Sequence, residues 1–181
     1  MKSHRFALIL AGVISACLFA TANAADKIKS HSPNGKFAMR LTEDGSELIE
    51  VKSGKVLLEL KESGAGWAKD SKLLWSPDSK YFAHFSENRR GGLTTVYRQN
   101  GATFEEVELP EIPECEKKNA GKVDVSQEPK RWLNSNTLVL LVREGWTDAD
   151  SDEGRECERT VTIAFDSNGK ASVKDVKKSK K

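Results

Sequence analysis

Short runs in which apolar and polar residues alternate recur along the chain, and turn-forming residues separate them. This pattern predicts β-strands, because successive side chains of a strand point to opposite faces of its sheet. Gly, Pro, Asn and Asp stand between the runs, where they favour tight reversals. We therefore expect an all-β protein whose strands cover 27–30, 37–42, 47–52, 56–60, 72–75, 81–86, 93–98, 103–109, 123–132, 137–143, 159–165 and 171–176.

Three stretches of the chain repeat one another. The string Ser-Pro-Asn-Gly-Lys-Phe-Ala at 32–38 returns as Ser-Pro-Asp-Ser-Lys-Tyr-Phe-Ala at 76–83, and a weaker copy, Trp-Leu-Asn-Ser-Asn-Thr-Leu, occupies 132–138. Each copy is a turn between two expected strands, and two further strands follow it. The chain therefore divides into three antiparallel four-stranded meander units, which could stack as a partial propeller or curl into a sandwich or barrel.

With its preceding tryptophan, the second copy reads Trp-Ser-Pro-Asp-Ser-Lys-Tyr-Phe-Ala at 75–83, which resembles the strand-turn-strand signature of TolB-type β-propeller blades. The resemblance implies four-stranded blades around an axis, and a role in binding proteins or ligands more often than in catalysis. Propellers have roughly four to eight blades, and a three-unit chain leaves strand edges to cover. Because the C-terminal strand ends in lysines, we favour a monomer in which units one and three meet and close the sheet. A homodimer or a bound partner is the alternative.

The first 24 residues predict a secretory signal peptide, because a basic start precedes an uncharged apolar run and a small-residue ending at Ala24. The mature protein is then a single domain at 25–176 with a lysine-rich tail at 177–181, and it is periplasmic or secreted. Two alternatives remain open. The apolar run is long enough to span a bilayer if it is not cleaved, and residues 14–17 resemble a lipobox, in which Cys17 would carry a lipid.

Two cysteines, Cys115 and Cys157, remain after the signal peptide. An even number in an oxidising compartment predicts one disulfide, with two free thiols as the alternative. Closing a loop of roughly 43 residues stabilises the folded state by about 4 kcal/mol in the chain-entropy model. The bridge would join the Pro-rich linker before the third unit to the long polar connection within that unit.

The connection between the second and third strands lengthens from unit to unit and is longest at 144–158. A scaffold that keeps its strands while lengthening loops at one end is a common way to build a binding surface. We therefore expect another envelope or extracellular protein to bind at this end. The expected contact residues are Arg89, Arg90, Trp146, Asp148, Asp150 and Asp152.

The acidic run Asp148, Asp150, Asp152 is also how a calcium loop begins, because Ca²⁺ prefers several oxygen ligands. The match then fails, since Gly154 comes one place late and Arg159 stands where a calcium loop has its glutamate. We expect no metal here and interpret the run as a solvated acidic loop, with calcium binding as the alternative.

Local signals of catalysis are absent from the sequence. His31 and His84 have no metal-ligand spacing to a cysteine or to each other, and there is no nucleophile elbow, P-loop or dinucleotide fingerprint. The 29 basic and 27 acidic side chains nearly cancel, so composition gives no reason to expect nucleic acid as a partner. We expect a binding protein that is not an enzyme and uses no cofactor.

A different class of function is suggested by Ser63-Gly64-Ala65-Gly66-Trp67. This string is similar to the S-G-x-x-Y loop with which exported lysozyme inhibitors of bacteria plug a hydrolase cleft, with Trp67 in place of the tyrosine. The resemblance implies that Ser63, Gly64 and Trp67 would enter the cleft of a lysozyme. The alternative is an ordinary Gly-rich connection between the first two units.

Overall fold

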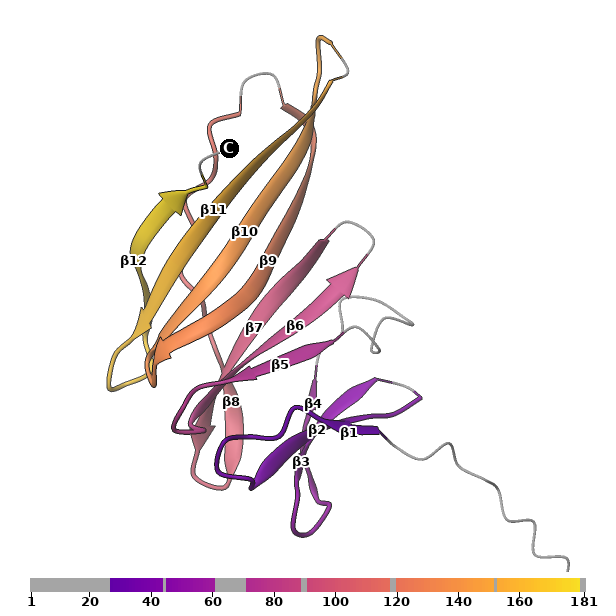
Figure 1. The fold of residues 1–181 in the computed structure, drawn as a ribbon, viewed down its shortest axis with the longest axis vertical. Coiled ribbons are helices and arrows are strands. Elements are labelled where there is room, and N and C mark those ends of the chain that lie inside the picture. The colour runs from indigo at the N-terminus through magenta and orange to yellow at the C-terminus, as the bar shows by residue number, and fades with distance from the viewer. Residues whose placement is uncertain are drawn as a thin grey trace, which may run out of the picture.

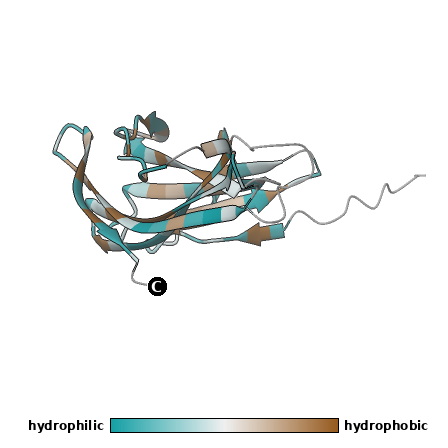
Figure 2. Cartoon of the chain, turned by 90° about the horizontal axis from the view of Figure 1, so that it is seen from above, coloured by the Kyte–Doolittle hydropathy of each residue, from teal (hydrophilic) through white to brown (hydrophobic). Residues whose placement is uncertain are grey.

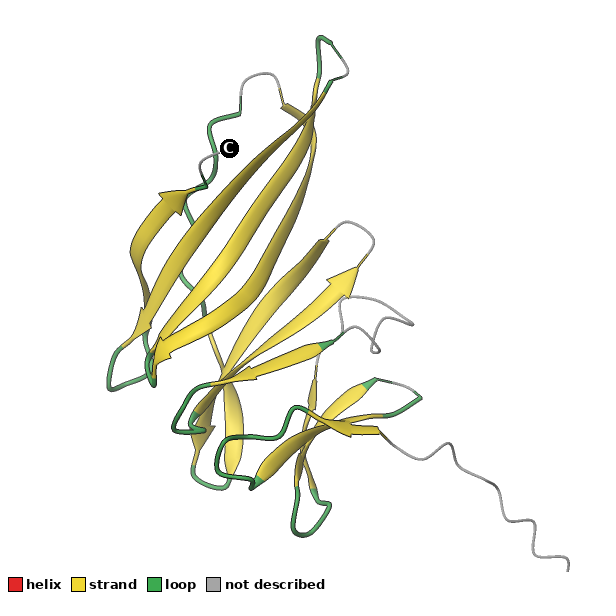
Figure 3. Ribbon diagram, in the orientation of Figure 1, coloured by secondary structure: helices red, strands yellow, loops and turns green. Residues whose placement is uncertain are grey.

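The computed structural model describes residues 27–43, 45–60, 71–88, 91–117, 120–151 and 153–179. All regular structure in these ranges is β-strand (Figures 1 and 3), which confirms the all-β prediction. Within the same ranges there is no helix that could cross a membrane. Export and the predicted signal peptide concern residues outside the described part of the chain.

The strands form three four-stranded antiparallel sheets, one from each predicted unit (Figure 1). The first holds β1 (Lys27–Lys29), β2 (Phe37–Leu41), β3 (Ser46–Glu50) and β4 (Val56–Leu60). The second holds β5 (Lys72–Trp75), β6 (Tyr81–Asn88), β7 (Gly91–Asn100) and β8 (Thr103–Val107). The third holds β9 (Ala120–Asn134), β10 (Thr137–Asp148), β11 (Gly154–Phe165) and β12 (Ala171–Lys178).

The second sheet is packed on both faces, and its strands alternate accordingly. Phe82 faces the first sheet in one apolar cluster, whereas its neighbours Tyr81 and Ala83 face the third sheet in another. The rings of Trp75 and Phe104 pack at a tilt against Phe82, with ring centroids 4.9 and 5.2 Å away. β6 is buried without interruption from Tyr81 to Ser86, as packing on both faces requires. Figure 2 shows the hydrophobic and hydrophilic bands of the chain from above.

The repeated turns make the same contacts in the first two units. The Ser76 hydroxyl donates to the Asp78 carboxylate and accepts the N–H of Tyr81, at 2.8 and 2.9 Å. Ser32 does the same between the side chain of Asn34 and the N–H of Phe37, at 2.8 and 3.0 Å. The shared strings therefore specify one local turn by the same hydrogen bonds.

A tryptophan joins the second sheet to the first unit, and another joins the third sheet to the second unit. The indole N–H of Trp75 donates to the carbonyl of Ser30 at 2.8 Å, and that of Trp132 donates to the carbonyl of Leu74 at 3.0 Å. The two tryptophans that align in the sequence thus have equivalent contacts. A bulky ring fills the gap between sheets while its polar N–H is satisfied by backbone.

The structure corrects the expected lengthening of loops. Residues 144–148 and 154–158 continue β10 and β11 as paired strand, so that Cys157 lies in β11 opposite Glu144. β10 ends at Asp148 and β11 begins at Gly154. Most charged residues of this stretch are exposed or half-buried, and Glu144 is buried. What grows from unit to unit is the hairpin, which extends as strand (Figure 1).

The expected closure of the sheet between units one and three is also wrong. The three sheets stay separate, and in the described ranges the main contacts of β1–β4 and β9–β12 outside their own sheets are with the second sheet. The outer face of the third sheet is polar there, with Arg143 pairing to Glu158 at 2.8 Å and approaching Glu128 at 3.9 Å.

At the C-terminal strand, Lys177 and Lys178 belong to β12 and not to a tail. Val176 is out of phase with Ala171 and Val173 in the sequence, yet all three pack on the second apolar cluster. A register shift beside Thr162 and Ile163 adds one residue to β12 and restores the phase. The lysines of this edge strand remain in position to discourage pairing with another chain.

We expect Phe82→Ala to destabilise the fold by about 3–5 kcal/mol, because the ring is fully buried among Trp75, Tyr97 and Phe104 and its loss leaves a cavity. Leu133→Ala is the matched control, since Leu133 is half exposed. Urea denaturation of the two variants measures both values. Equal midpoints would contradict the packing described here.

Candidate protein-binding cleft

Residues 108–117, called the linker from here on, connect β8 to the start of the third unit and run behind the third sheet (Figure 1). Leu109 and Ile112 pack against the second apolar cluster. Cys115 is buried and forms a disulfide with Cys157, with a Cα–Cα distance of 6.5 Å. The predicted disulfide is therefore present, and it fixes the linker to β11.

A buried group of charges lies beside the disulfide. Glu144 and Arg159, which are 3% and 2% exposed, form an ion pair on the inner face of the third sheet. Arg159 also donates to the carbonyl of Pro113, and Lys117 lies 2.7 Å from the second carboxylate oxygen of Glu144. Three connections besides the disulfide thus tie the linker to the sheet, since the N–H of Cys115 donates to Glu144 at 3.3 Å as well.

The protonation of Glu144 depends on these neighbours. Burial by itself would raise the pKa of the carboxyl, but the hydrogen bond from Lys117 and the charge of Arg159 outweigh it and hold the pKa below its ordinary value of 4.5. Hydrogen bonds to Glu144 and Glu114 raise the pKa of Lys117. The group therefore stays ionised around neutral pH and holds the linker as a set of ion pairs.

A cleft of about 540 Å³ opens between β7, the linker and the inner face of the third sheet. We call it the β7–linker cleft. One wall is the first half of β7, with Leu93, and the opposite wall is the linker; Val125 and Val142 contribute apolar surface from the third sheet. Leu93 is 50% exposed and Val125 38%, so large apolar side chains remain open to solvent here.

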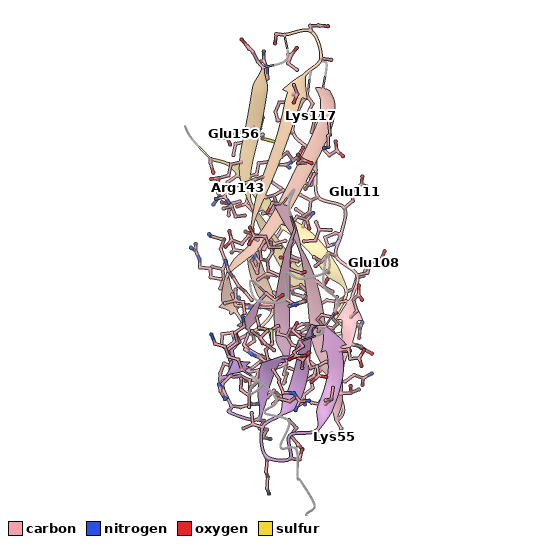
Figure 4. The ribbon with its side chains drawn as sticks, turned by 90° about the vertical axis from the view of Figure 1, so that its right-hand side faces the viewer. Lys55, Glu108, Glu111, Lys117, Arg143 and Glu156 are labelled. Carbon is pink, nitrogen blue, oxygen red and sulfur yellow. A yellow bond between two sulfur atoms is a disulfide. The ribbon has the colours of Figure 1, made fainter. Side chains whose placement is uncertain are left out.

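The lining of the cleft is strongly acidic. Four glutamates come from β8 and the linker, namely Glu106, Glu108, Glu111 and Glu114. With Glu144 at the bottom they outnumber the two cations of the lining, Lys117 and Arg159, which already pair with Glu144. Figure 4 shows Glu108, Glu111 and Lys117 one above another along one side of the molecule, away from Arg143 and Glu156 on the other.

Three of the sequence-predicted contact residues are described, and Trp146, Asp148 and Asp150 lie beyond this cleft toward the end of the β10–β11 hairpin. Trp146 is half-buried two residues after Glu144, and its buried indole N–H has no acceptor among the described residues. The Asp148 carboxylate accepts the N–H groups of Asp150 and Ser151, and the first of these bonds is the main reason why its pKa is lowered. Asp148 thus shapes the turn. A partner-binding role for Trp146 and Asp150 stays a prediction.

Several other predicted residues fall outside the described ranges: Cys17, Ser63, Gly64, Trp67, Arg89, Arg90 and Asp152. Within those ranges no group of three His, Cys, Asp or Glu side chains is arranged to hold a metal ion. His84 is buried in β6 and His31 is exposed before β2.

Sequence reasoning missed Glu144, Arg159 and Lys117, which lie in separate segments and meet only through strand register. One signal was available. Glu144 continues the apolar series Leu138, Leu140, Val142 at every second position, so it stands on the buried face of β10. A charge at such a position requires a buried partner.

No family model matches the chain, and no curated protein matches it. Among solved structures it is similar to a protein described as TolB from Agrobacterium tumefaciens, at 15% identity and a TM-score of 0.38, covering 87% of this chain and 50% of that one. It is also similar to TolB from Acinetobacter baumannii, at 10% identity and a TM-score of 0.33, covering 84% of this chain and 43% of that one. The chain spans half of these proteins or less, and similarity of this degree concerns the arrangement of strands at most.

We expect non-reducing peptide mapping of the oxidised protein to find one peptide pair joined through Cys115 and Cys157. Because the bridge holds the linker, reduction should speed amide exchange in 108–117 before it affects β6 or β10. Cys115→Ser should cost about 2–4 kcal/mol of stability. Free thiols at both positions in the oxidised protein would contradict the disulfide.

We expect Glu144→Gln to destabilise the protein by about 3–5 kcal/mol at pH 7, since it leaves Arg159 buried without its counter-charge. The folded pKa of Glu144 is lowered, so its contribution is complete above pH 4.5 and disappears as the pH falls through the folded pKa. The difference in stability between the native protein and the variant should therefore become smaller below pH 4.5. Glu59→Gln on the exposed side of β4 is the control, and a pH profile unchanged by Glu144→Gln would contradict the assignment.

Proposed function

We propose that the protein is an exported, non-enzymatic binding protein of the cell envelope that binds another protein through the β7–linker cleft and the neighbouring tip of the β10–β11 hairpin. The observation that carries the proposal is the cleft itself, with exposed Leu93 and Val125 beside a row of linker glutamates. Apolar groups that a monomer leaves open beside a polar rim are typical of protein-binding sites.

Two features support a protein rather than a small molecule as the ligand. The cleft is bounded along one side by an extended segment, so that Glu108, Glu111 and Glu114 follow one another along its rim. Its deepest polar groups, Glu144 and Arg159, bind each other and the linker, and few polar groups remain to orient a small ligand. Because Glu144 and Arg159 are paired in this way, a structural role is favoured for them over a role in proton transfer.

Two further observations support export. The first 24 residues have the pattern of a signal peptide, and the disulfide is of a kind that persists in oxidising compartments. The periplasm or the extracellular space is therefore the proposed location, with lipidation at Cys17 as the alternative form of the mature N-terminus.

The test is site-specific photocrosslinking in cells that express the full chain. A photoreactive residue at Leu93 or Val125 should give an adduct of one partner mass in the envelope fraction. The same residue at Val51, which is 40% exposed on the first unit, is the control and should give none. Absence of an adduct from both cleft positions would overturn the proposal. An adduct with a lysozyme, formed from Trp67 and from neither cleft position, would establish the inhibitor reading instead.

A further inference from the structure

The linker carries a three-residue repeat. Residues 108–115 read Glu-Leu-Pro-Glu-Ile-Pro-Glu-Cys, so that a glutamate is followed each time by an apolar residue and, in the first two repeats, by a proline. Burial has the same period. The three glutamates are exposed, Leu109 and Ile112 are half-buried against the second apolar cluster, and Cys115 is buried. The linker therefore presents one column of carboxylates to solvent and one column of anchors to the protein.

A period of three residues is that of the polyproline II helix, which rises about 3.1 Å per residue. Pro110 and Pro113 fix their own φ near about −65° and disfavour the helical region for the residues before them, Leu109 and Ile112. The described part of the chain has no cis peptide bond, and residues 108–117 belong to no strand. Successive glutamates of the linker therefore follow one another about 9 Å apart.

Two of these glutamates have no counter-charge in the protein. Glu114 pairs with Lys117 at 3.0 Å, but Glu108 and Glu111 form no ion pair with any residue that the structure describes. Residues 105–116 hold six glutamates and no cation, in a chain whose basic and acidic side chains nearly cancel. The excess of negative charge is thus concentrated along the rim of the β7–linker cleft.

The floor of the cleft adds two further requirements for a ligand. Leu93 and Val125, at 50% and 38% exposed, are apolar groups open to solvent there. Arg159 lines the bottom of the cleft and is 2% exposed, and its buried Nε–H has no acceptor among the residues that the structure describes. An unmet buried donor is costly, so a ligand gains affinity if it brings an oxygen to this atom.

We infer that the β7–linker cleft binds a proline-rich, cationic segment of the partner in the polyproline II conformation, with a lysine or arginine at every third residue. This inference rests on the proposed function and specifies its ligand. The cations of such a segment recur at the spacing of Glu108 and Glu111, and its adjacent apolar column faces Leu93 and Val125. Its backbone makes no internal hydrogen bonds, so a carbonyl oxygen is available to accept the Arg159 Nε–H. A segment held extended by proline loses little conformational entropy on binding.

Other regular segments fit the cleft less well. A β-strand places successive side chains of one face about 6.6 Å apart, and an α-helix places them about 5–6 Å apart. Neither spacing matches about 9 Å. β7 contributes side chains and not an open strand edge, since β9 lies against it and the buried Thr94 donates its hydroxyl to the carbonyl of Gln127.

The test measures binding of fluorescein-Lys-Val-Pro-Lys-Val-Pro-Lys-amide, the spaced peptide, to the oxidised mature protein by fluorescence anisotropy. The scrambled peptide, fluorescein-Lys-Lys-Lys-Val-Pro-Val-Pro-amide, has the same composition, charge and number of Val-Pro pairs. We expect it to bind about fivefold more weakly, because two of its three cations miss their carboxylates. Equal binding of the two peptides would overturn the inference.

Conformation is tested by the spaced peptide with glycine in place of both prolines. This version keeps the charges and their order along the chain but loses the preference for an extended backbone. We expect it to bind about threefold more weakly than the spaced peptide. Unchanged binding would overturn the polyproline II assignment.

On the protein side, Glu108→Gln with Glu111→Gln removes the two unpaired charges. The double variant should bind the spaced peptide about fivefold more weakly and should affect the scrambled peptide less. Both side chains are exposed, so the urea midpoint and the peptide pair joined through Cys115 and Cys157 should not change. Glu59→Gln on the first sheet is the matched control and should leave binding unchanged. An equal effect of the double variant on the two peptides would contradict the matched spacing.

The partner itself separates failure of this inference from failure of the proposed function. If the partner identified by crosslinking from Leu93 or Val125 binds the double variant as tightly as the native protein, the inference is overturned and the proposed function stands. If no adduct forms from either position, the proposed function fails whatever the peptides do.

Discussion

The burial of both faces of the second sheet is the constraint on which the rest of the structure depends. Phe82 and Tyr97 point into one apolar cluster, and Ala83 and Val96, their neighbours along the same strands, point into the other. The first and third sheets each obtain their core from this one sheet. The middle sheet therefore has no face left to pack against a further element.

The third sheet is longer than the sheet that covers it, and this mismatch explains the linker. The inner faces of β10 and β11 continue past the end of β8 with Glu144 and Arg159. Without the linker, these two charged side chains would be exposed to solvent on one side and would contact apolar residues on the other. The linker covers them with its Cys115 and Pro113 backbone groups, and the disulfide holds that cover in place. The covering segment lies beside β7 without pairing to it, and the cleft is the space that remains.

Much of this architecture could be predicted from the sequence. Each feature that could not be predicted was missed for a specific physical reason. The strings at 32–38 and 76–83 specify a local turn, so the three units and most strand positions followed from them. The hairpin extension at 144–158 was interpreted as a loop because its polar sequence, with Arg155 and Glu156 both exposed, shows no apolar alternation. The pairing of Glu144 with Arg159 depends on register between two strands, and local patterns do not contain register. The cleft depends on where β8 stops, which is set by the packing of Leu109 and Ile112.

The fixed linker also decides what kind of binding the cleft can support. Its wall is held by a disulfide and by ion pairs to Glu144, so the gap between linker and β7 is set before any ligand arrives. A preorganised site loses less conformational entropy on binding than one that must order its own wall. The same bridge makes the width of the cleft depend on oxidation of Cys115 and Cys157, so the site is complete only where the disulfide can form.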